Sequence, residues 1–316
     1  METLVVLQEL PDTLLERIAE AAPHWQVHAA LTPEDRLRRL PDAEIVFGWH
    51  ADAADLTLRP GTKLRWIQCW GAGVDKFPLE ELARLGIVLT HTSGIHAYPI
   101  SEVIVMMMLV LTKRFQLTLR DQQQRKWRPD WQPELHGKTI GIVGVGEIGQ
   151  ETAKIAQAFG MTVLGVRRSA APLPHIDRMY AMDDLDRVLG ESDFVVVTLP
   201  LTPDTYRIMN RSRFAAMKRD ACYINVGRGR TTDEQALIEA LQSGTIAGAA
   251  LDVFETEPLP ADSPLWTMDN VLVSPHQSGA SRHYADRAVD LFVRNLRDYA
   301  QGRPPAINCT DWRKRY

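Results

Sequence analysis

The stretch TIGIVGVGEIGQETAKIAQAFG, residues 139–160, decides the fold of this chain. It opens with a short apolar run, which predicts a buried β-strand. Glycines then follow with the spacing GxGxxG, and an amphipathic helical pattern comes directly after them. A second apolar run at residues 162–166 predicts the next parallel strand. A strand, a glycine turn and a helix in this order are typical of a dinucleotide-binding βαβ unit.

Each glycine of the loop has its own physical reason. Gly144 permits the tight turn, Gly146 lets a pyrophosphate approach the backbone, and Gly149 allows the helix to pack closely on the strand. Glu147 and Ile148 stand between them, where free N–H groups and the helix dipole attract an anion. We therefore predict that these five residues bind a dinucleotide. The alternative, a merely glycine-rich turn, does not account for the flanking strands and helix.

The end of the second strand predicts which dinucleotide is bound. An acidic residue normally stands about 20 residues after the first glycine and holds the ribose hydroxyls. Here the sequence reads Arg167-Arg168-Ser169. A guanidinium can grip a 2′-phosphate that an acid would repel. The three residues therefore favour NADP(H) over NAD(H), unless the arginines are only a solvated surface pair.

Composition excludes several other classes of protein. The chain has 316 residues, enough for two domains, and a formal net charge of −4, which does not suggest a nucleic-acid or membrane-surface partner. The longest apolar run, VIVMMMLVL, is far shorter than the ~20 residues of a membrane span.

Cys69, Cys222 and Cys309 lack the spacing of a disulfide framework or zinc site, and His91 and His96 share no ligand pattern with the acids. We expect no metal. The amino-terminal residues do not read as a signal peptide, so a cytoplasmic protein is expected.

Alternating apolar runs and helical patterns predict an α/β fold with two doubly wound parallel sheets. The strands expected in the first half are residues 4–7, 44–47, 64–70 and 87–89, with helices at 11–22 and 77–85. Those expected in the second half are residues 139–143, 162–166, 194–199, 222–226, 248–253 and 271–274, before a final helix at 281–301. One long helix is expected at residues 101–124, with methionines in the core, and a polar excursion at residues 125–138.

Three stretches near the ends of later strands carry candidate catalytic residues: INVGRGRTTDEQAL, ALDVFETEPLP and VLVSPHQSGAS. They contribute Arg228, then Asp252 and Glu257, then His276 and Gly279. Ligands of open α/β sheets bind at such strand ends. Hydride transfer to a 2-oxo acid needs a cation for the carboxylate, for which Arg228 is suited. It also needs a proton donor, and histidine titrates near neutral pH, while Glu257 could orient that donor.

These motifs resemble those of the D-isomer-specific 2-hydroxyacid dehydrogenase family along nearly the whole chain. VGVGEIG, TLPLTPDTYRIMN, INVGRG, ALDVFETEPLP and SPHQSGA occur in the family's order. The resemblance implies that Arg228, Glu257 and His276 form a catalytic triad and that Asp252 lies near the nicotinamide. It also places around the cofactor Pro200, Thr205, Val226, Gly227 and Gly279.

The resemblance extends to the first half of the chain. CWGAGVDKF matches the loop whose amides hold the substrate carboxylate, which points to Ala72 and Gly73, and Trp49 could line the pocket or fill the core. A flavodoxin-like substrate domain of residues 1–98 and 285–316 is implied, with a Rossmann cofactor domain of residues 99–284 inserted into it and the active site in the cleft. The 125–138 excursion resembles the family's dimerisation arm, so a homodimer is expected.

The sequence departs from the family pattern at Arg167, where many members carry an NAD-selecting Asp. In this departure it resembles the NADP-using glyoxylate and hydroxypyruvate reductases. Gln277 and Ser278 also differ from the usual residues. We expect an NADP(H)-dependent reductase of small 2-oxo acids that forms D-2-hydroxy acids, with His276 as general acid. Two alternatives stay open: an NAD(P)-sensing protein similar to the family's corepressors, or an NAD-dependent enzyme such as a phosphoglycerate dehydrogenase. A formate dehydrogenase is disfavoured, because that branch has Gln where Glu257 stands.

Overall fold

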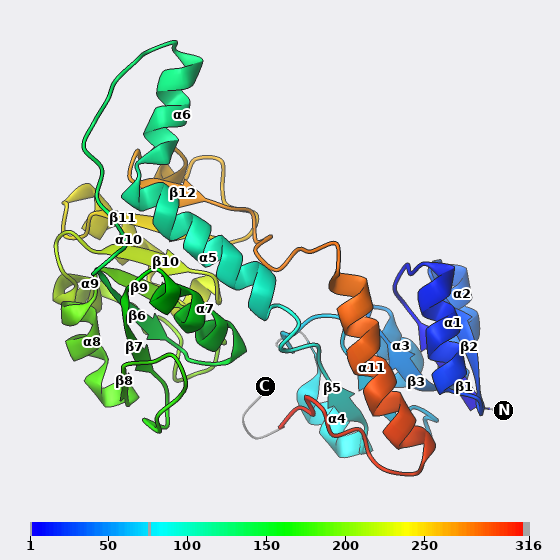
Figure 1. Ribbon diagram of the computed structural model, residues 1–316. Coiled ribbons are helices and arrows are strands. Elements are labelled where there is room, and N and C mark those ends of the chain that lie inside the picture. Colours follow the sequence, from blue (N-terminus) through cyan, green and yellow to red (C-terminus); the bar gives the residue numbers. More distant parts are fainter. Residues whose placement is uncertain (1, 75–76, 312–316) are drawn as a thin grey trace. The chain divides into compact units, whose positions relative to one another are not determined.

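The computed structural model describes residues 2–74 and 77–311 (Figure 1). The chain forms two compact units. The first unit contains Met1–Ile95 and Ser281–Tyr316, and the second is His96–Ala280. Each unit has its own parallel sheet covered by helices, so the predicted fold class is confirmed.

The first unit has a five-stranded parallel sheet in the order β2-β1-β3-β4-β5, which is the flavodoxin-like order. Its strands are β1 (Glu2–Val6), β2 (Trp25–Ala29), β3 (Ala43–Phe47), β4 (Trp66–Gln68) and β5 (Val88–Thr90). Its helices are α1 (Asp12–Ala21), α2 (Pro33–Arg39), α3 (Ala53–Thr57), α4 (Leu79–Leu85) and α11 (Tyr284–Ala300), with a 3-10 turn η1 (Leu40–Asp42). The sequence did not predict β2 or α2, because QVHA and the charged PEDRLRR have weak periodicity.

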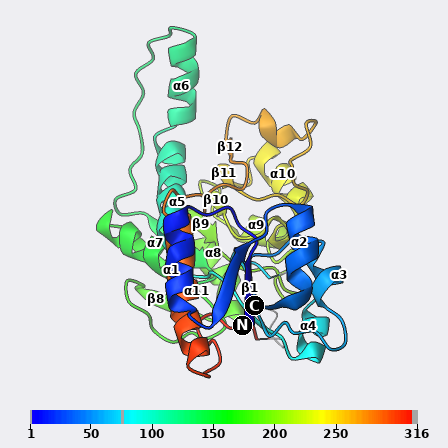
Figure 2. The ribbon, with the colours of Figure 1, turned by 90° about the vertical axis from the view of Figure 1, so that its right-hand side faces the viewer.

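Alternate residues of the strands feed two separate cores. On β1, Leu4 packs with α1 and α11, whereas its neighbour Val5 packs on the opposite face with Leu82 of α4. Figure 2 shows α1 beside α11 on one side of β1 and α2, α3 and α4 on the other. This alternation follows from the period of two of a strand.

The second unit has a seven-stranded parallel sheet in the order β12-β11-β10-β9-β6-β7-β8. Its strands are β6 (Thr139–Val143), β7 (Thr162–Val166), β8 (Arg178–Tyr180), β9 (Phe194–Val197), β10 (Cys222–Asn225), β11 (Gly248–Leu251) and β12 (Val271–Val273). Its helices are α5 (Ala97–Thr112), α6 (Phe115–Gln123), α7 (Glu147–Ala158), α8 (Leu185–Glu191), α9 (Arg211–Ala216) and α10 (Glu234–Gln242), with 3-10 turns η2 (Met182–Asp184), η3 (Gly229–Thr231) and η4 (Pro264–Trp266). Counted from β6, this is the doubly wound order, and the winding reverses between β6 and β9.

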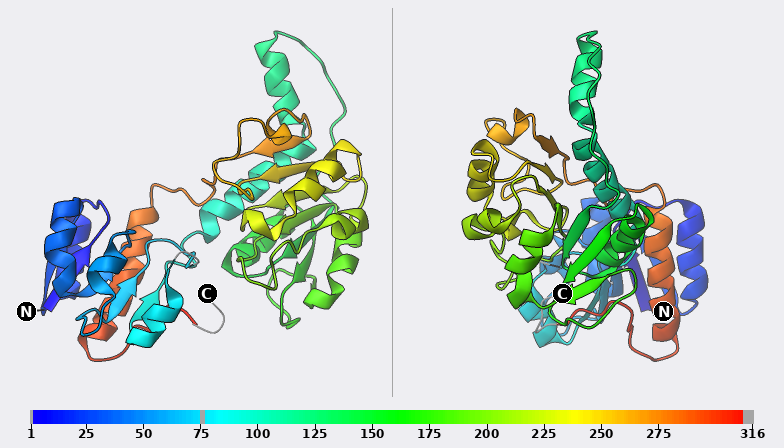
Figure 3. Two further views of the ribbon diagram at one scale, coloured as in Figure 1. Left: turned by 180° about the vertical axis from the view of Figure 1, so that it is seen from behind. Right: turned by 60° about the vertical axis from the view of Figure 1, so that its left-hand side comes forward.

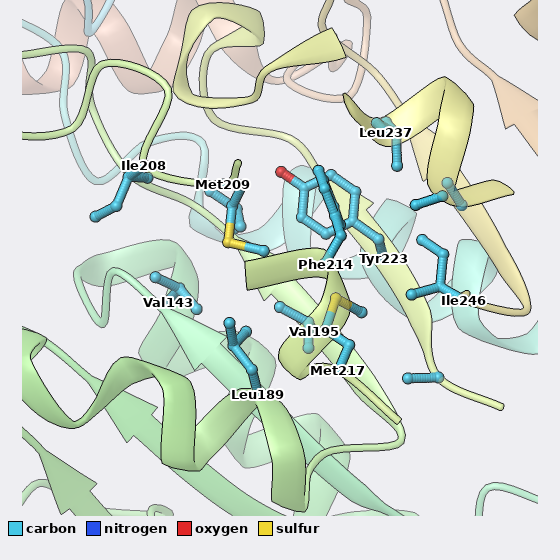
Figure 4. Close-up of a cluster of buried hydrophobic side chains, with 14 of the residues drawn as sticks. Val143, Leu189, Val195, Ile208, Met209, Phe214, Met217, Tyr223, Leu237 and Ile246 are labelled. Atoms are coloured by element: carbon cyan, nitrogen blue, oxygen red, sulfur yellow. The ribbon is translucent and has the colours of Figure 1, made fainter. Parts of the chain in front are cut away.

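Helices cover both faces of this sheet. Helices α5 and α7 pack on one face, around Ile142 and Val196, and α8, α9 and α10 pack on the other. Figure 4 shows the second core, where Phe214 meets the buried ring of Tyr223 edge-on at 5.3 Å between centroids. The Tyr223 hydroxyl, at the edge of this core, lies 2.6 Å from Thr232 Oγ1.

The expected single helix at residues 101–124 is wrong. The chain forms α5 and α6 instead, separated at Arg114, whose φ of 47° is left-handed and interrupts the helix. Met107 and Met108 are in the core as expected, but Met106 is half-exposed. None of the residues of α6 is buried, and Figure 3 shows this helix standing away from the sheet of its own unit.

Other differences concern the ends of elements and one missed strand. Strands β4, β9 and β11 are shorter than the predicted ranges 64–70, 194–199 and 248–253. The short strand β8 was not predicted. In the described part of the chain, every helix is too short or too polar to cross a membrane. No group of three or more metal-ligating side chains is found among residues 2–74 and 77–311.

Candidate active site

The glycine loop lies at the point where the winding of the second sheet reverses. Gly144 follows β6 with a φ of 103°, a conformation that favours glycine. A Cβ atom there would lie 2.9 Å from a side-chain carbon of Leu199, the residue that follows β9 by two positions. The N–H of Gly144 bonds to the carbonyl of Val166 at 2.9 Å, which fixes the loop against the end of β7.

The residues of this loop fit a bound pyrophosphate. Gly146 is the N-cap of α7 and no side chain caps the helix there. A Cβ atom at Gly146 would meet nothing within 4 Å, so space is open in front of the helix N-terminus. Gly149, in contrast, packs tightly, since a Cβ atom there would lie 3.1 Å from the Gly144 carbonyl oxygen. Glu147 is exposed and Ile148 half-buried in the first turn. The open glycine, the uncapped N–H groups and the helix dipole together suit an anion.

The predicted phosphate-selecting residues stand beside this loop, directly after β7. Arg167 is half-buried, and its backbone N–H bonds to the carbonyl of Tyr180 at 3.2 Å. Within residues 2–74 and 77–311, no carboxylate pairs with the Arg167 guanidinium. Arg168 and Ser169 are exposed. Hence the end of β7 carries positive charge and no acid.

The loop after β9 lies between the glycine loop and the turn after β10, since Leu199 contacts both Gly144 and Gly227. The buried Thr205 hydroxyl donates to the carbonyl of Pro200 at 2.7 Å and accepts from the N–H of Thr202 at 2.7 Å. This hydroxyl is therefore used to shape its own loop. Gly227, after β10, approaches the same loop so closely that a Cβ atom would lie 2.6 Å from the Leu199 carbonyl oxygen. Its neighbour Val226 is buried, with its N–H on the carbonyl of Val197.

Arg228 projects from the turn between β10 and η3. It is half-buried, and its Nη1 donates to the carbonyl of Gly227 at 2.9 Å. Beneath the turn lies Asn225, which sequence reasoning did not select. The Asn225 carboxamide bonds to both Gly227 N at 2.9 Å and Arg228 O at 3.2 Å. Its place in the INVGRG motif was the signal available.

Asp252, the residue after β11, holds the segment that carries His276. Its carboxylate is fully buried and accepts from Ser274 Oγ at 2.6 Å and from the N–H groups of Gln277 and Ser278 at 3.0 Å each. Its carbonyl accepts from His276 N at 2.9 Å. Gln277 and Ser278 depart from the usual family residues, yet this anchoring uses their backbones.

The described contacts bring Glu257 and His276 together. Glu257 Oε2 lies 2.7 Å from His276 Nδ1, and Glu257 Oε1 accepts from the N–H of Phe254 at 3.0 Å. His276 has a φ of 51°, a left-handed conformation that its N–H bonds to Asp252 and Ser274 hold in place. The imidazole is 50% exposed, so it is accessible to a small ligand.

The turn of Arg228 contacts the segment that anchors this pair. A Cβ atom at Gly229 would lie 1.9 Å from the Phe254 carbonyl oxygen, so the two backbones touch. The other neighbour of the site is His96, whose ring lies 2.8 Å from where a Cβ of Gly279 would be. Burial lowers the pKa of His96 to about 4, with the charge of Arg228 adding to the effect. A neutral imidazole therefore stands near Arg228, and nothing in the spacing of the histidines indicated it.

The predicted substrate loop belongs to the first unit, after β4. Two hydroxyls, those of Thr92 and Tyr284, donate to the carbonyl of Trp70 at 2.7 Å each and hold the loop. Ala72 and Gly73 are half-buried, and two members of the matched motif, residues 75 and 76, lie outside the described part of the chain. The ring of Trp49 packs against that of Phe77, tilted by 32° with 5.4 Å between centroids. Substrate binding by Ala72, Gly73 and Trp49 stays a prediction.

Comparison with known proteins gives this arrangement a family. The model of the D-isomer specific 2-hydroxyacid dehydrogenase, NAD binding domain, matches residues 105–278. Glyoxylate/hydroxypyruvate reductase B of Serratia proteamaculans is 36% identical over 305 residues, which cover 93% of this chain and 93% of the relative.

Solved structures agree with this match. A D-isomer specific 2-hydroxyacid dehydrogenase family protein from Aeromonas salmonicida is similar with a TM-score of 0.88 and 35% identity, over 98% of this chain and 99% of that one. The NADPH-dependent glyoxylate/hydroxypyruvate reductase of Sinorhizobium meliloti, solved with NADP and sulfate, has a TM-score of 0.85 and 30% identity over the whole of both chains. The chain therefore belongs to the D-isomer specific 2-hydroxyacid dehydrogenase family.

Proposed function

We propose that the protein reduces small 2-oxo acids, such as glyoxylate or hydroxypyruvate, to D-2-hydroxy acids with NADPH. The observation that carries the proposal is the pair of Glu257 Oε2 and His276 Nδ1 at 2.7 Å, next to the turn of Arg228. These residues follow neighbouring strands in the unit that also holds the glycine loop. Relatives named glyoxylate/hydroxypyruvate reductase support the substrate class.

Each side chain has its own task in this proposal. Arg228 holds the substrate carboxylate, because its planar guanidinium matches carboxylate geometry. His276 donates the proton to the carbonyl oxygen from Nε2, since Nδ1 faces Glu257. Glu257, anchored on the Phe254 N–H, fixes the orientation of the imidazole ring through its contact with Nδ1. A nicotinamide dinucleotide held by the glycine loop would supply the hydride that reduces the carbonyl carbon.

The glycine loop and Arg167 are the proposed dinucleotide site. Gly144, Gly146, Gly149 and the first turn of α7 hold the pyrophosphate, and Arg167, with Arg168, takes the 2′-phosphate. The remaining proposed cofactor-binding residues are Ser169, Pro200, Thr205, Val226, Gly227, Asp252 and Gly279. The relative from Sinorhizobium meliloti, solved with NADP, supports this choice of dinucleotide.

A panel of 2-oxo acids assayed with NADPH and with NADH tests the proposed reaction. We expect glyoxylate or hydroxypyruvate to be reduced, with kcat/KM higher for NADPH by roughly 10- to 150-fold, the equivalent of one charge-assisted bond of about 1.5–3 kcal/mol. Binding of NADPH without turnover of any 2-oxo acid would favour a sensor protein instead. An equal or better rate with NADH would remove the NADP assignment.

Replacing Arg167 with serine should abolish that preference. The kcat/KM with NADPH should fall roughly 10- to 150-fold, while the value with NADH stays within about twofold, because only the phosphate contact is lost. Arg219→Ser is a matched control, since Arg219 is an exposed arginine of the same unit at the amino end of β10. A parallel loss with both nucleotides in Arg167→Ser would show a structural rather than a selective role.

We also propose that two copies of the chain associate through α5, α6 and the segment after them. An apolar groove of about 550 Å³ is lined by α5 and its neighbours, including Met106, Leu109, Phe115 and Ile155. The segment at residues 125–134 is held by its polar atoms, with Arg114 to Asp130 at 3.3 Å and Lys113 to the Pro133 carbonyl at 2.7 Å.

Two tryptophans of this segment support self-association. Trp127 and Trp131 are 95% and 97% exposed. Large apolar side chains that project into solvent in this way are typical of a surface that binds another protein chain. The chain thus carries both an apolar groove and projecting apolar rings in one unit, which is the self-complementarity that a two-fold interface requires.

Replacing Met106 with glutamate should turn the dimer into a monomer. Met106 lines the groove and is 50% exposed in the single chain, so a charge there would be buried only on association. Light scattering after size exclusion measures the mass. Leu37→Glu is the matched control, because Leu37 is 64% exposed but lies in the first unit. A wild-type protein that is monomeric at micromolar concentration would contradict the proposal.

A further inference from the structure

Four buried polar side chains form a network under the turn that carries Arg228. They are Tyr223, Asn225, Thr231 and Thr232, none of them more than 4% exposed. The Tyr223 hydroxyl lies 2.6 Å from Thr232 Oγ1, which in turn receives Asn225 Nδ2 at 3.0 Å. Figure 4 shows the hydroxyl of Tyr223 at the edge of the otherwise apolar core. A buried network of this kind is rigid only if its polar atoms are satisfied.

Asn225 is the centre of this network. As the last residue of β10, it is fixed by the sheet on one side and reaches forward to the turn on the other. Its Oδ1 accepts from the N–H of Gly227 at 2.9 Å, and the two hydrogens of its Nδ2 are shared among the carbonyl of Arg228 at 3.2 Å, Thr231 Oγ1 at 3.2 Å and Thr232 Oγ1 at 3.0 Å. Thr231 donates to the same Arg228 carbonyl at 2.6 Å. Asn225 therefore holds the peptide group before Gly227 and the peptide group after Arg228, so it brackets the Gly227–Arg228 backbone.

The orientation of the carboxamide is determined by its neighbours. A backbone N–H can only donate and a backbone carbonyl can only accept. Turning the amide over would set its NH₂ against the N–H of Gly227 and its oxygen against the carbonyl of Arg228. Asparagine is the side chain of this length that offers both a donor and an acceptor, whereas aspartate offers acceptors alone.

We propose that Asn225 is a positioning residue for substrate binding: it sets the backbone of Arg228 so that the guanidinium meets the substrate carboxylate. This rests on the proposed function of Arg228. Asn225 itself is buried and reaches the substrate site only through the backbone of Gly227 and Arg228. The network ends at Tyr223, which makes no described hydrogen bond to residues 227 or 228 and so serves as an internal control.

The test measures carboxylate binding apart from turnover. Oxamate, a dead-end analogue of a 2-oxo acid, is used as inhibitor with NADPH, together with the Kd of NADPH and the Tm. Asn225→Asp removes the donor to Arg228 and keeps the acceptor for Gly227, and Asn225→Ser is a second variant that adds no charge. We expect the oxamate inhibition constant to rise at least about tenfold in both, which corresponds to about 1.4 kcal/mol. The Kd of NADPH should stay within about twofold in Asn225→Asp, which keeps the acceptor for Gly227, and Tyr223→Phe should leave both constants unchanged while lowering the Tm.

A double-mutant cycle separates positioning from general weakening. In an Arg228→Gln background, Asn225→Ser should cause no further rise in the oxamate constant, because the residue through which it acts is gone. Additive losses, or equal losses for oxamate and NADPH, would overturn the inference. A wild-type protein that neither binds oxamate nor reduces a 2-oxo acid would overturn the proposed function instead. Normal wild-type behaviour with unaffected Asn225 variants would overturn only the inference.

Discussion

Replacing His276 with asparagine should lower the kcat for 2-oxo acid reduction by at least about 100-fold, the loss seen when one group that stabilises a transition state is removed. Asparagine keeps a polar side chain but cannot carry a proton to the carbonyl oxygen. The left-handed backbone at residue 276 also tolerates asparagine well, so the fold of the segment should survive. Stopped-flow hydride transfer and steady-state kcat both measure the effect, and the Kd of NADPH should stay unchanged.

Two further variants sharpen this result. Glu257→Gln keeps a side chain of the same shape next to His276 Nδ1 but removes the charge, so we expect a smaller loss of kcat than for His276→Asn. His24→Asn, an exposed histidine of the first unit, should have no effect. A rate for His276→Asn within a few-fold of the wild type would remove the proton-donor role, whatever the behaviour of Glu257→Gln.

Replacing Asp252 with asparagine should cost both stability and turnover. The carboxylate accepts three hydrogen bonds on two oxygens and is fully buried. An amide can keep the bonds to one oxygen, but its NH₂ then faces a backbone N–H. We expect the free energy of unfolding to fall by about 2.5–6 kcal/mol, from one lost charge-assisted bond and one buried donor left unsatisfied. Because the segment that carries His276 is released, kcat should fall about as far as in His276→Asn.

Urea denaturation without any nucleotide gives the first quantity, and the matched control is Asp262→Asn at an exposed aspartate. The experiment also decides between two roles for Asp252. A loss of stability in the nucleotide-free protein supports anchoring of the histidine segment. Unchanged stability with a weaker affinity for NADPH would instead support direct contact with the nicotinamide, as the resemblance implies.

The sequence predicted those parts of the fold that depend on local pattern. The apolar run before Gly144, the glycine spacing and the helix after it specify a βαβ unit on their own, and the structure has β6, α7 and β7 there. The alternation of runs also predicted two parallel-sheet α/β units, which the strand orders confirm. Weakly apolar or edge elements were missed, such as β2 and β8, because their stability comes from pairing with a neighbour rather than from a pattern.

Other features depend on contacts that no local pattern encodes. Arg114 lies in a stretch of good helix formers, yet it takes a left-handed φ and separates α5 from α6. Asp252 was predicted to meet the nicotinamide, and its three bonds to the 274–278 segment become visible only when β11 and β12 lie side by side. Asn225 stands inside a recognised motif, but a motif does not reveal that its amide faces the backbone on both sides of Arg228.

The direct contact of Gly229 with the Phe254 carbonyl leaves no adjustable layer between the arginine turn and the segment that anchors Glu257. Since β10 and β11 are adjacent, the separation of their ends is fixed by strand spacing at about 4.8 Å. Through the contact of Glu257 with His276 Nδ1, the same spacing constrains the position of the imidazole relative to Arg228. A ligand whose carboxylate and reactive carbon are one bond farther apart could contact both Arg228 and His276 only by bending. We therefore expect the site to discriminate more strictly against a longer spacing between these two groups than against a larger substituent elsewhere on the substrate.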